Sequence, residues 1–233
     1  MIHVLGAAKK KDVDGRDKPG HDKSDAMADT APTLTFIHRY VPAEVTGRTP
    51  LLLLHGTGGN ESDLIPLGLQ LSPGAALLSP RGKVSENGMP RFFKRRAEGV
   101  FDVKDLTART TELADFVTEA RKAYGLEKPI AVGFSNGANI AWSLLLNHPE
   151  ALKGAILLRG MMPFERPAGM KLDGVPVLIL NGSEDSIVPA DTRDRLVQAL
   201  KHAGADVRYE ILPAGHQLTR QDLVLATDWL NAR

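Results

Sequence analysis

Apolar runs long enough to form buried strands recur along the chain. Leu51–Leu54 is apolar at every position, as expected of a central parallel strand that is covered on both faces. The runs Ile130–Phe134, Ala155–Leu158 and Val175–Leu180 have the same character. Weaker strand patterns lie at residues 34–41, at residues 75–79 before Pro80, and at residues 207–212.

Segments with helical spacing separate these runs. Beyond Leu106 an apolar face lies opposite a charged face, and Gly125 ends the pattern. Further helices are predicted at residues 64–71, with Asn60 or Ser62 as the cap, and at residues 191–203 and 221–231. Strands that alternate with helices predict an α/β fold, in which helices cover both faces of a doubly wound, mostly parallel sheet.

Residues 1–30 differ in composition from the rest of the chain. Lys9–Asp25 combines charged residues, glycine and proline with a single aliphatic residue, Val13. Such a stretch cannot bury enough apolar surface to offset the entropy that is lost on ordering. We therefore expect a disordered extension over residues 1–30 and one domain over residues 31–233, with Met27 as an alternative start of translation.

The composition excludes several classes of function. Lys and Arg total 29 against 28 for Asp and Glu, so no excess of positive charge indicates nucleic-acid binding. The absence of cysteine excludes disulfides, a thiolate nucleophile and a cysteine-bound metal. No apolar run approaches the roughly 18 residues of a membrane span, and Ile2–Ala8 is too short for a secretory signal. We expect a cytoplasmic protein.

Residues 133–137 read GFSNG and follow directly on an apolar, β-branched run. This is the G-x-S-x-G pattern of a nucleophile elbow, in which a strand turns sharply into a helix and exposes the serine hydroxyl above the sheet. Glycines are needed there because a Cβ atom would collide where strand and helix nearly touch. The next residues keep a helical pattern as far as His148 and Pro149. Ser135 is therefore the candidate nucleophile.

A serine hydroxyl needs a neighbouring base, and that base needs a carboxylate to orient it. In doubly wound hydrolases both follow the nucleophile, in the order Ser, Asp or Glu, His. His148 ends the elbow helix and His202 lies on a charged helical face, whereas His216 comes just after a predicted strand. We select His216 as the general base.

The carboxylate is expected in the loop that follows the strand at residues 175–180. Glu184 and Asp185 both lie in this loop, and only one of them can orient the histidine. Asp185 is nearer to Ile187–Pro189, where the chain turns back toward the next helix. We therefore select Asp185 and interpret Glu184 as a solvated neighbour.

The tetrahedral intermediate of acyl transfer needs hydrogen-bond donors, and backbone amides are the usual source. The N–H group of Asn136 follows the nucleophile at a helix N-terminus, where the helix dipole favours negative charge. A second donor is expected in the glycine-rich loop His55–Gly59, with Thr57 as the first choice and Gly58 as the second. We interpret His55 as a structural histidine that orients this loop through its ring nitrogens.

Together these residues resemble the carboxylesterase and phospholipase branch of the α/β-hydrolase superfamily, which includes acyl-protein thioesterases. The similarity extends from about Pro50 to Trp229 and rests on the segments HGTGGNESDLIPLG, NGMPRFF, VGFSNGANIAWSLL, NGSEDSIVP and LPAGHQL. It implies an α/β-hydrolase fold without a large cap domain, a serine esterase mechanism without cofactor or metal, and small-molecule ester or thioester substrates. The residues at the family's positions are Ser135, Asp185 and His216 for the catalytic triad and Thr57 for the oxyanion hole.

The segment Arg81–Lys104 shows no sustained period and is interpreted as a long surface excursion. It follows the strand at residues 75–79, so its tip is expected to roof the active-site cleft. We assign Met89, Phe92 and Phe93 of this segment, together with Gly58, to substrate binding, and expect at least one of the three apolar side chains to line the acyl pocket. The alternative is that they hold the segment to the core.

Two features depart from the family pattern. Phe134 and Asn136 stand where many members have a small residue, and the middle loop carries the basic run Lys94–Arg96, interpreted as a solvated face. The acyl and leaving-group pockets are therefore expected to differ from those of these members. Dienelactone hydrolases share the architecture but use a cysteine nucleophile, which this chain lacks.

The favoured prediction is a serine carboxylesterase that cleaves esters of small to medium acyl groups through an acyl-enzyme. A thioesterase or a lysophospholipase is the alternative within the enzymes, because a catalytic triad does not determine which leaving group is released. A non-catalytic ligand-binding protein on the same fold is the alternative from another class. The order Ser, Asp, His argues against it. Whether the chain forms a homodimer is also open.

Overall fold

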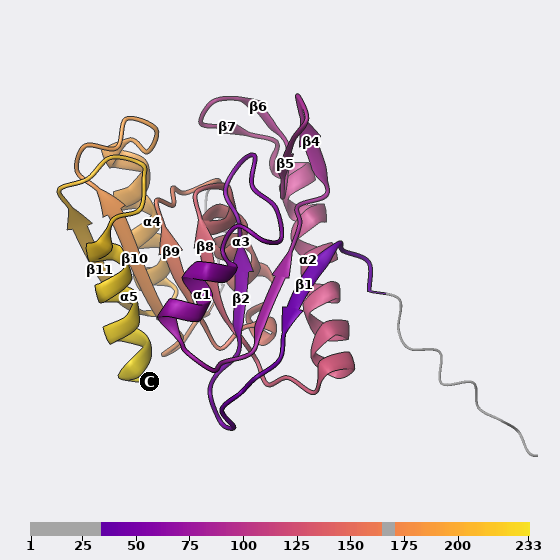
Figure 1. Cartoon of the computed structure of the whole chain (residues 1–233). Helices are drawn as coiled ribbons and strands as arrows, with labels where there is room; N and C mark the ends of the chain where they lie inside the picture. Colours follow the sequence, from indigo (N-terminus) through magenta and orange to yellow (C-terminus); the bar gives the residue numbers. More distant parts are fainter. Residues whose placement is uncertain (1–33, 165–170) are drawn as a thin grey trace, which may run out of the picture. The chain divides into compact units, whose positions relative to one another are not determined.

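A computed structural model describes residues 34–164 and 171–233, which belong to one unit of the chain, Pro32–Arg233. The predicted disordered extension, residues 1–30, lies outside the described residues. The central sheet has the strand order β1-β3-β2-β8-β9-β10-β11 (Figure 1). β1 is antiparallel to β3, and the other neighbouring strands of this sheet are parallel. The strands are β1 His38–Val41, β2 Leu51–Leu54, β3 Leu77–Pro80, β8 Ile130–Phe134, β9 Gly154–Leu158, β10 Pro176–Gly182 and β11 Asp206–Leu212.

Helices cover both faces of this sheet (Figure 1). They are α1 Ile65–Leu71, α2 Val103–Tyr124, α3 Asn136–Asn147, α4 Ala190–His202 and α5 Arg220–Asn231, with a 3-10 turn at Pro149–Ala151. α1 and α5 share one core with Leu51 and Leu53, whereas α2, α3 and α4 share the other core with Leu52 and Leu54. Successive strand residues face opposite sides, so β2 supplies alternate leucines to the two cores. The predicted α/β fold with a doubly wound, mostly parallel sheet is confirmed.

The ends of two helices test the predicted start and stop signals. α2 begins after Asp102, whose side chain accepts a hydrogen bond from a backbone N–H, and it ends at Gly125 with φ of 64°, as predicted from the glycine. The predicted caps of α1 are wrong. α1 begins after Leu64 without a side-chain cap, and the Asn60 side chain instead accepts a hydrogen bond from the Ser62 N–H at 2.8 Å within the preceding turn.

The excursion over residues 81–104 contains β-hairpins that the sequence analysis does not predict. They are formed by β4 Val84–Glu86 with β5 Met89–Arg91, and by β6 Arg95–Ala97 with β7 Val100–Phe101. Strands of three or two residues are too short to show a period. The available signal is the pair Asn87-Gly88, with φ of 52° and 80°, because Asn-Gly is typical of tight hairpin turns.

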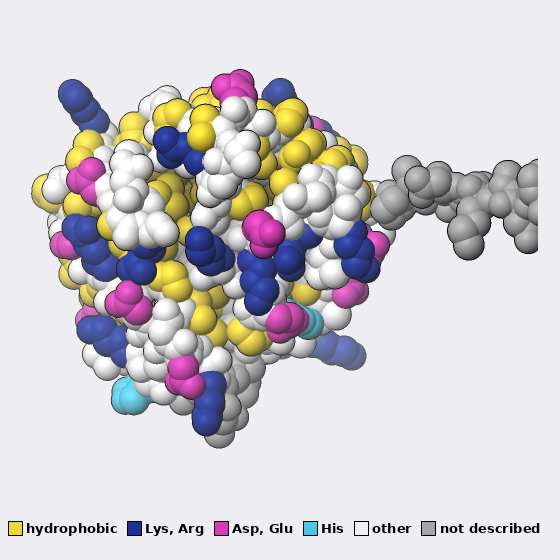
Figure 2. Space-filling view, turned by 90° about the horizontal axis from the view of Figure 1, so that it is seen from below, with side chains coloured by type: hydrophobic (Ala, Val, Ile, Leu, Met, Phe, Trp, Pro, Cys, Tyr) yellow, Lys and Arg dark blue, Asp and Glu magenta, His cyan; other side chains and the backbone are white. Residues whose placement is uncertain are grey.

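The amino ends of the parallel strands lie opposite the nucleophile elbow. Seen from below, the molecule presents basic and acidic side chains that are interspersed rather than separated by sign (Figure 2). A hollow of about 600 Å³ at these strand ends has a lining that includes Ala43 and residues 45–50 and 125–128, and no predicted site residue borders it. Within the described ranges, none of the helices has both the length and the apolar character that crossing a bilayer requires.

The elbow is built on a close approach of β2, β8 and α3. A Cβ atom placed on Gly137 would lie 1.9 Å from the Leu54 carbonyl oxygen, and one on Gly133 would lie 2.4 Å from the Gly137 carbonyl oxygen. The glycines at both ends of GFSNG therefore let the helix start directly against the two strands. Between them Ser135 has φ of 52° and ψ of −112°, a conformation that L-residues rarely adopt.

Gly137→Ala is expected to lower the free energy of unfolding by roughly 3 kcal/mol, because its methyl group collides with backbone that cannot move aside cheaply. Chemical denaturation followed by circular dichroism measures this change. Gly215→Ala is the control, since the nearest atom to an added Cβ there is 3.8 Å away. Equal stability of the two variants would contradict the close approach.

Candidate active site

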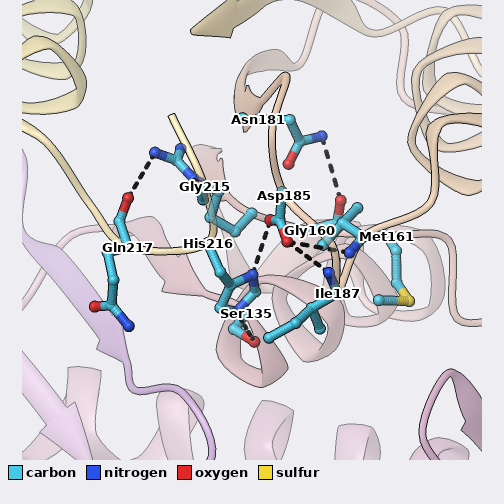
Figure 3. Close-up of polar contacts among 12 residues, drawn as sticks. Ser135, Gly160, Met161, Asn181, Asp185, Ile187, Gly215, His216 and Gln217 are labelled. Carbon is cyan, nitrogen blue, oxygen red and sulfur yellow. Dashed lines mark hydrogen bonds and ion pairs between the residues drawn. The ribbon is translucent and has the colours of Figure 1, made fainter. Parts of the chain in front are cut away.

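Three side chains from distant parts of the chain meet at the carboxyl ends of the strands (Figure 3). His216 Nε2 lies 2.9 Å from Ser135 Oγ, and His216 Nδ1 lies 2.8 Å from Asp185 Oδ2. Because an ionised carboxylate only accepts hydrogen bonds, Nδ1 carries the proton and Nε2 accepts from the serine hydroxyl. The structure thus brings together the residues that the sequence analysis selected, in the geometry of a nucleophile, a base and an orienting carboxylate.

Asp185 is held as a buried acceptor. Its side chain has 0% relative exposure, and Oδ1 accepts the N–H groups of Ile187 at 2.9 Å and Val188 at 3.2 Å. Both carboxylate oxygens are therefore occupied, one by the turn and one by the histidine. Glu184 is exposed, in agreement with its interpretation as a solvated neighbour.

The loop that carries the histidine is fixed by Arg159, a residue that the sequence analysis missed. Its guanidinium donates to the Gly215 carbonyl oxygen at 2.9 Å and to the Gln217 carbonyl oxygen at 3.0 Å, so both neighbours of His216 are held. It also forms a two-point ion pair with Asp222 at 2.6 and 2.8 Å. The side chains of this pair are 0% and 3% exposed.

Arg159 lies just beyond β9, where the chain leaves the sheet with φ of 54°. Asp222 at the same time completes the capping box of α5, accepting the N–H and hydroxyl of Thr219 at 2.8 and 2.9 Å. One carboxylate therefore joins a helix start to the histidine loop. The signal available in the sequence is an arginine placed directly after a buried apolar strand, where a lone charge needs a partner.

The predicted oxyanion donors lie at the ends of β2 and β8. Asn136 is the first residue of α3. The described hydrogen bonds include no acceptor for the backbone N–H of Asn136 or for the backbone N–H of Thr57. Gly58, the second choice, is excluded as a donor because its N–H already donates to the Pro90 carbonyl oxygen at 2.9 Å. Thr57 Oγ1 accepts a hydrogen bond from Arg91 Nη1 at 2.7 Å.

The predicted substrate contacts of the excursion separate into two groups. Phe92 and Phe93 are 2% and 0% exposed and belong to the core that α2 and α3 share. The expectation that these rings line an acyl pocket is corrected, because a ring without exposed surface holds the excursion to the core instead. Met89 is 40% exposed, and its side chain lies 3.7 Å from the position of an added Cβ on the exposed Gly58, so these two residues lie next to each other at the surface.

A hollow of about 290 Å³ opens beside the histidine loop. Its lining includes Thr57, Phe134, Gln217 and Leu218. The Phe134 ring packs against the His216 ring with centroids 5.3 Å apart. The bulky residue in the elbow motif therefore forms a wall between the base and this hollow.

His55 is the structural histidine that the sequence analysis predicts. Its Nδ1 lies 2.7 Å from the Gly56 carbonyl oxygen, and its Nε2 accepts the Gly82 N–H at 3.0 Å. One nitrogen donates and the other accepts, so the ring is neutral. The side chain is buried, and this burial lowers the pKa of His55 below its usual value. It joins the glycine-rich loop His55–Gly59 to the start of the excursion.

Comparison with known proteins gives the class of this fold and site. The sequence profile of the alpha/beta hydrolase fold family matches residues 9–172. The chain is 46% identical over 193 residues to MhqD of Bacillus subtilis (strain 168), which is named as a hydrolase, and the match covers 82% of this chain and 96% of that protein. The chain belongs to the α/β-hydrolase family.

Solved structures of carboxylesterases share the fold. The carboxylesterase of Bacillus cereus is 44% identical with a TM-score of 0.83, covering 85% of this chain and 94% of that one. The carboxylesterase of Mesorhizobium loti is 34% identical with a TM-score of 0.81, covering 87% and 99%. These similarities support a hydrolase without an evident cap domain.

Asp222→Asn should destabilise the protein strongly, because it leaves the buried Arg159 without its counter-ion. Breaking such a pair costs about 3–5 kcal/mol, which corresponds to a fall of roughly 10 °C in Tm for a chain of this size. Differential scanning calorimetry measures it. Asp228→Asn on the exposed face of α5 is the matched control, and a similar small change in both variants would refute a stabilising role of the pair.

The lowered pKa of His55 also predicts a pH dependence of stability. Below the unfolded-state pKa of about 6.5, the unfolded chain binds a proton that the folded ring refuses, so stability falls as pH decreases. Tm measured from pH 8 to pH 5 should decline less steeply in His55→Gln than in the wild type. The exposed His202→Gln variant should keep the wild-type slope. An unchanged slope in His55→Gln would count against the neutral buried ring.

Proposed function

We propose that this hydrolase is a serine carboxylesterase that works through an acyl-enzyme intermediate. The observation that carries the proposal is the continuous hydrogen-bonded series from Asp185 through His216 to Ser135, with distances of 2.8 and 2.9 Å. Such a series activates a serine hydroxyl at neutral pH, which an isolated serine cannot achieve.

In the first half-reaction, Ser135 Oγ attacks the ester carbonyl carbon while His216 Nε2 takes the hydroxyl proton. Asp185 stabilises the imidazolium that forms, and the amides of Thr57 and Asn136 donate to the oxyanion of the tetrahedral intermediate. The intermediate collapses when His216 returns the proton to the departing alkoxide. The alcohol leaves and the acyl group stays on Ser135 as an ester.

In the second half-reaction, water takes the place of the alcohol. His216 removes its proton as the oxygen attacks the acyl-enzyme carbonyl, and the same oxyanion donors are used again. Collapse of the second intermediate returns the proton to Ser135 Oγ and releases the carboxylic acid. All proton transfers in this cycle pass through His216 Nε2.

The surroundings favour substrates of modest size. The hollow of about 290 Å³ is lined by Thr57 of the proposed oxyanion loop and by Phe134, and it has room for one small to medium group of the ester. The esters that we propose therefore carry small to medium acyl groups. Initial rates on a panel of esters and matched thioesters with increasing acyl length separate a carboxylesterase from a thioesterase or a lysophospholipase.

Ser135→Ala should reduce ester turnover by about 10⁵-fold or more and abolish labelling by a fluorophosphonate probe, because both require the activated hydroxyl. Ser183→Ala, at an exposed serine after β10, is the control and should label like the wild type. An unlabelled wild type would instead favour a non-catalytic ligand-binding protein.

The carboxylate assignment has its own matched pair within the same experiment. Asp185→Asn should lower kcat by about 10⁴-fold, since it favours the wrong histidine tautomer. The exposed Glu184→Gln should change kcat by less than about twofold. The reverse order of effects would move the orienting role to Glu184.

A further inference from the structure

Three consecutive residues of the excursion hold the two segments that carry the proposed oxyanion donors. The Pro90 carbonyl oxygen accepts the Gly58 N–H at 2.9 Å. Arg91 Nη1 donates to Thr57 Oγ1 at 2.7 Å, and the Phe92 N–H donates to the Asn136 side-chain oxygen at 2.8 Å. One end of this short segment thus contacts the loop after β2, and the other contacts the nucleophile elbow.

We propose that Pro90–Phe92 sets the separation of the two oxyanion donors, and that Arg91 is a positioning residue which acts through Thr57. The inference rests on the serine esterase function proposed above. It gives the excursion a role in transition-state stabilisation that differs from the substrate-lining role expected from its sequence.

The segment is rigid enough for this role. The Arg91 side chain is only 3% exposed, and its Nε lies 3.2 Å from Glu86 Oε2 and donates to the Phe93 carbonyl oxygen at 3.2 Å. The rings of Phe92 and Phe93 are buried in the core, so the segment cannot rotate about its own axis. Phe92 also packs on His55 with ring centroids 4.7 Å apart, at the base of the oxyanion loop.

The oxyanion loop needs such support because it has little of its own. Thr57 is exposed and lies between Gly56 and Gly58, and Gly58 has φ of 83°. Glycine-rich backbone has high conformational freedom, and an oxyanion donor is effective only when it is held in place before the charge develops. The two bonds from Pro90 and Arg91 therefore replace the packing that side chains would provide elsewhere.

The kinetic consequence follows from where the contact is made. An oxyanion donor binds the transition state more strongly than the ground state, so a displaced donor lowers kcat and leaves KM nearly unchanged. Complete loss of one donor costs about 10²–10³-fold in kcat. A displaced but present donor is therefore expected to cost about tenfold to a hundredfold.

The test is a double-mutant cycle with Arg91→Lys and Thr57→Val on ester turnover. Lysine keeps the charge but not the planar fork, and valine keeps the shape of threonine without the acceptor oxygen. Each single variant should lower kcat at least about tenfold with KM within about twofold, and the double variant should be no worse than the poorer single variant. Affinity for a trifluoromethyl ketone, which forms a tetrahedral adduct, should fall in parallel.

Arg95→Lys is the matched control. Arg95 contacts the same Glu86 carboxylate at 2.9 Å, but its contacts reach neither the oxyanion loop nor the elbow. This variant should keep kcat within about twofold of the wild type. Multiplicative losses in the double variant, or a loss confined to KM, would overturn the proposal.

A measurement that does not depend on turnover separates this inference from the proposed function. Amide hydrogen exchange followed by mass spectrometry should show faster exchange in peptides covering residues 56–59 in Arg91→Lys, but not in Arg95→Lys, relative to the wild type. Unchanged exchange there would overturn the positioning role even if Ser135 is the nucleophile. Faster exchange in a protein without Ser135-dependent turnover would support the positioning role while refuting the esterase.

Discussion

The contact between the nucleophile elbow and β2 is the constraint on which the rest of the site depends. An alanine at position 137 would not fit, because its methyl group would lie 1.9 Å from the Leu54 carbonyl oxygen. This contact fixes the start of α3, and the start of α3 in turn fixes the strained backbone of Ser135 and the amide of Asn136. Strain of this kind costs on the order of 1–3 kcal/mol. Burial of the apolar side chains along α3, which is almost entirely enclosed, offsets it.

The loops around the elbow are held by buried polar groups and only in part by apolar packing. Arg159 holds the histidine loop, His55 joins the glycine-rich loop His55–Gly59 to the excursion, and Arg91 donates a hydrogen bond to Thr57. Hydrogen bonds suit this task because they specify direction, whereas apolar contacts tolerate small rotations. The cost is that each buried cation must keep its acceptors, so that the removal of one partner affects the whole loop.

Most of the fold was predictable because it depends on patterns that one sequence carries. Leu51–Leu54 and Ile130–Phe134 are short apolar runs typical of buried strands, and the GFSNG motif placed Ser135 between strand and helix. The predicted triad residues follow from the order of the loops, since parallel strands bring their carboxyl ends to one edge. Phe92 and Phe93 could not be placed in this way, because an apolar residue in an irregular segment fits a pocket and a core equally well. The role of Arg159 depends on Asp222, a partner far along the chain that no local pattern indicates.

Asp222 has a consequence for how the protein would lose its activity. The same carboxylate caps α5 and neutralises the arginine that holds the histidine loop. Stability is not uniform across a structure, and single elements can open locally without global unfolding. When α5 opens, Asp222 leaves with it, and Arg159 loses its counter-ion while the sheet and the elbow are still folded. A local opening of α5 would therefore release the histidine loop, and activity would disappear before the central sheet melts.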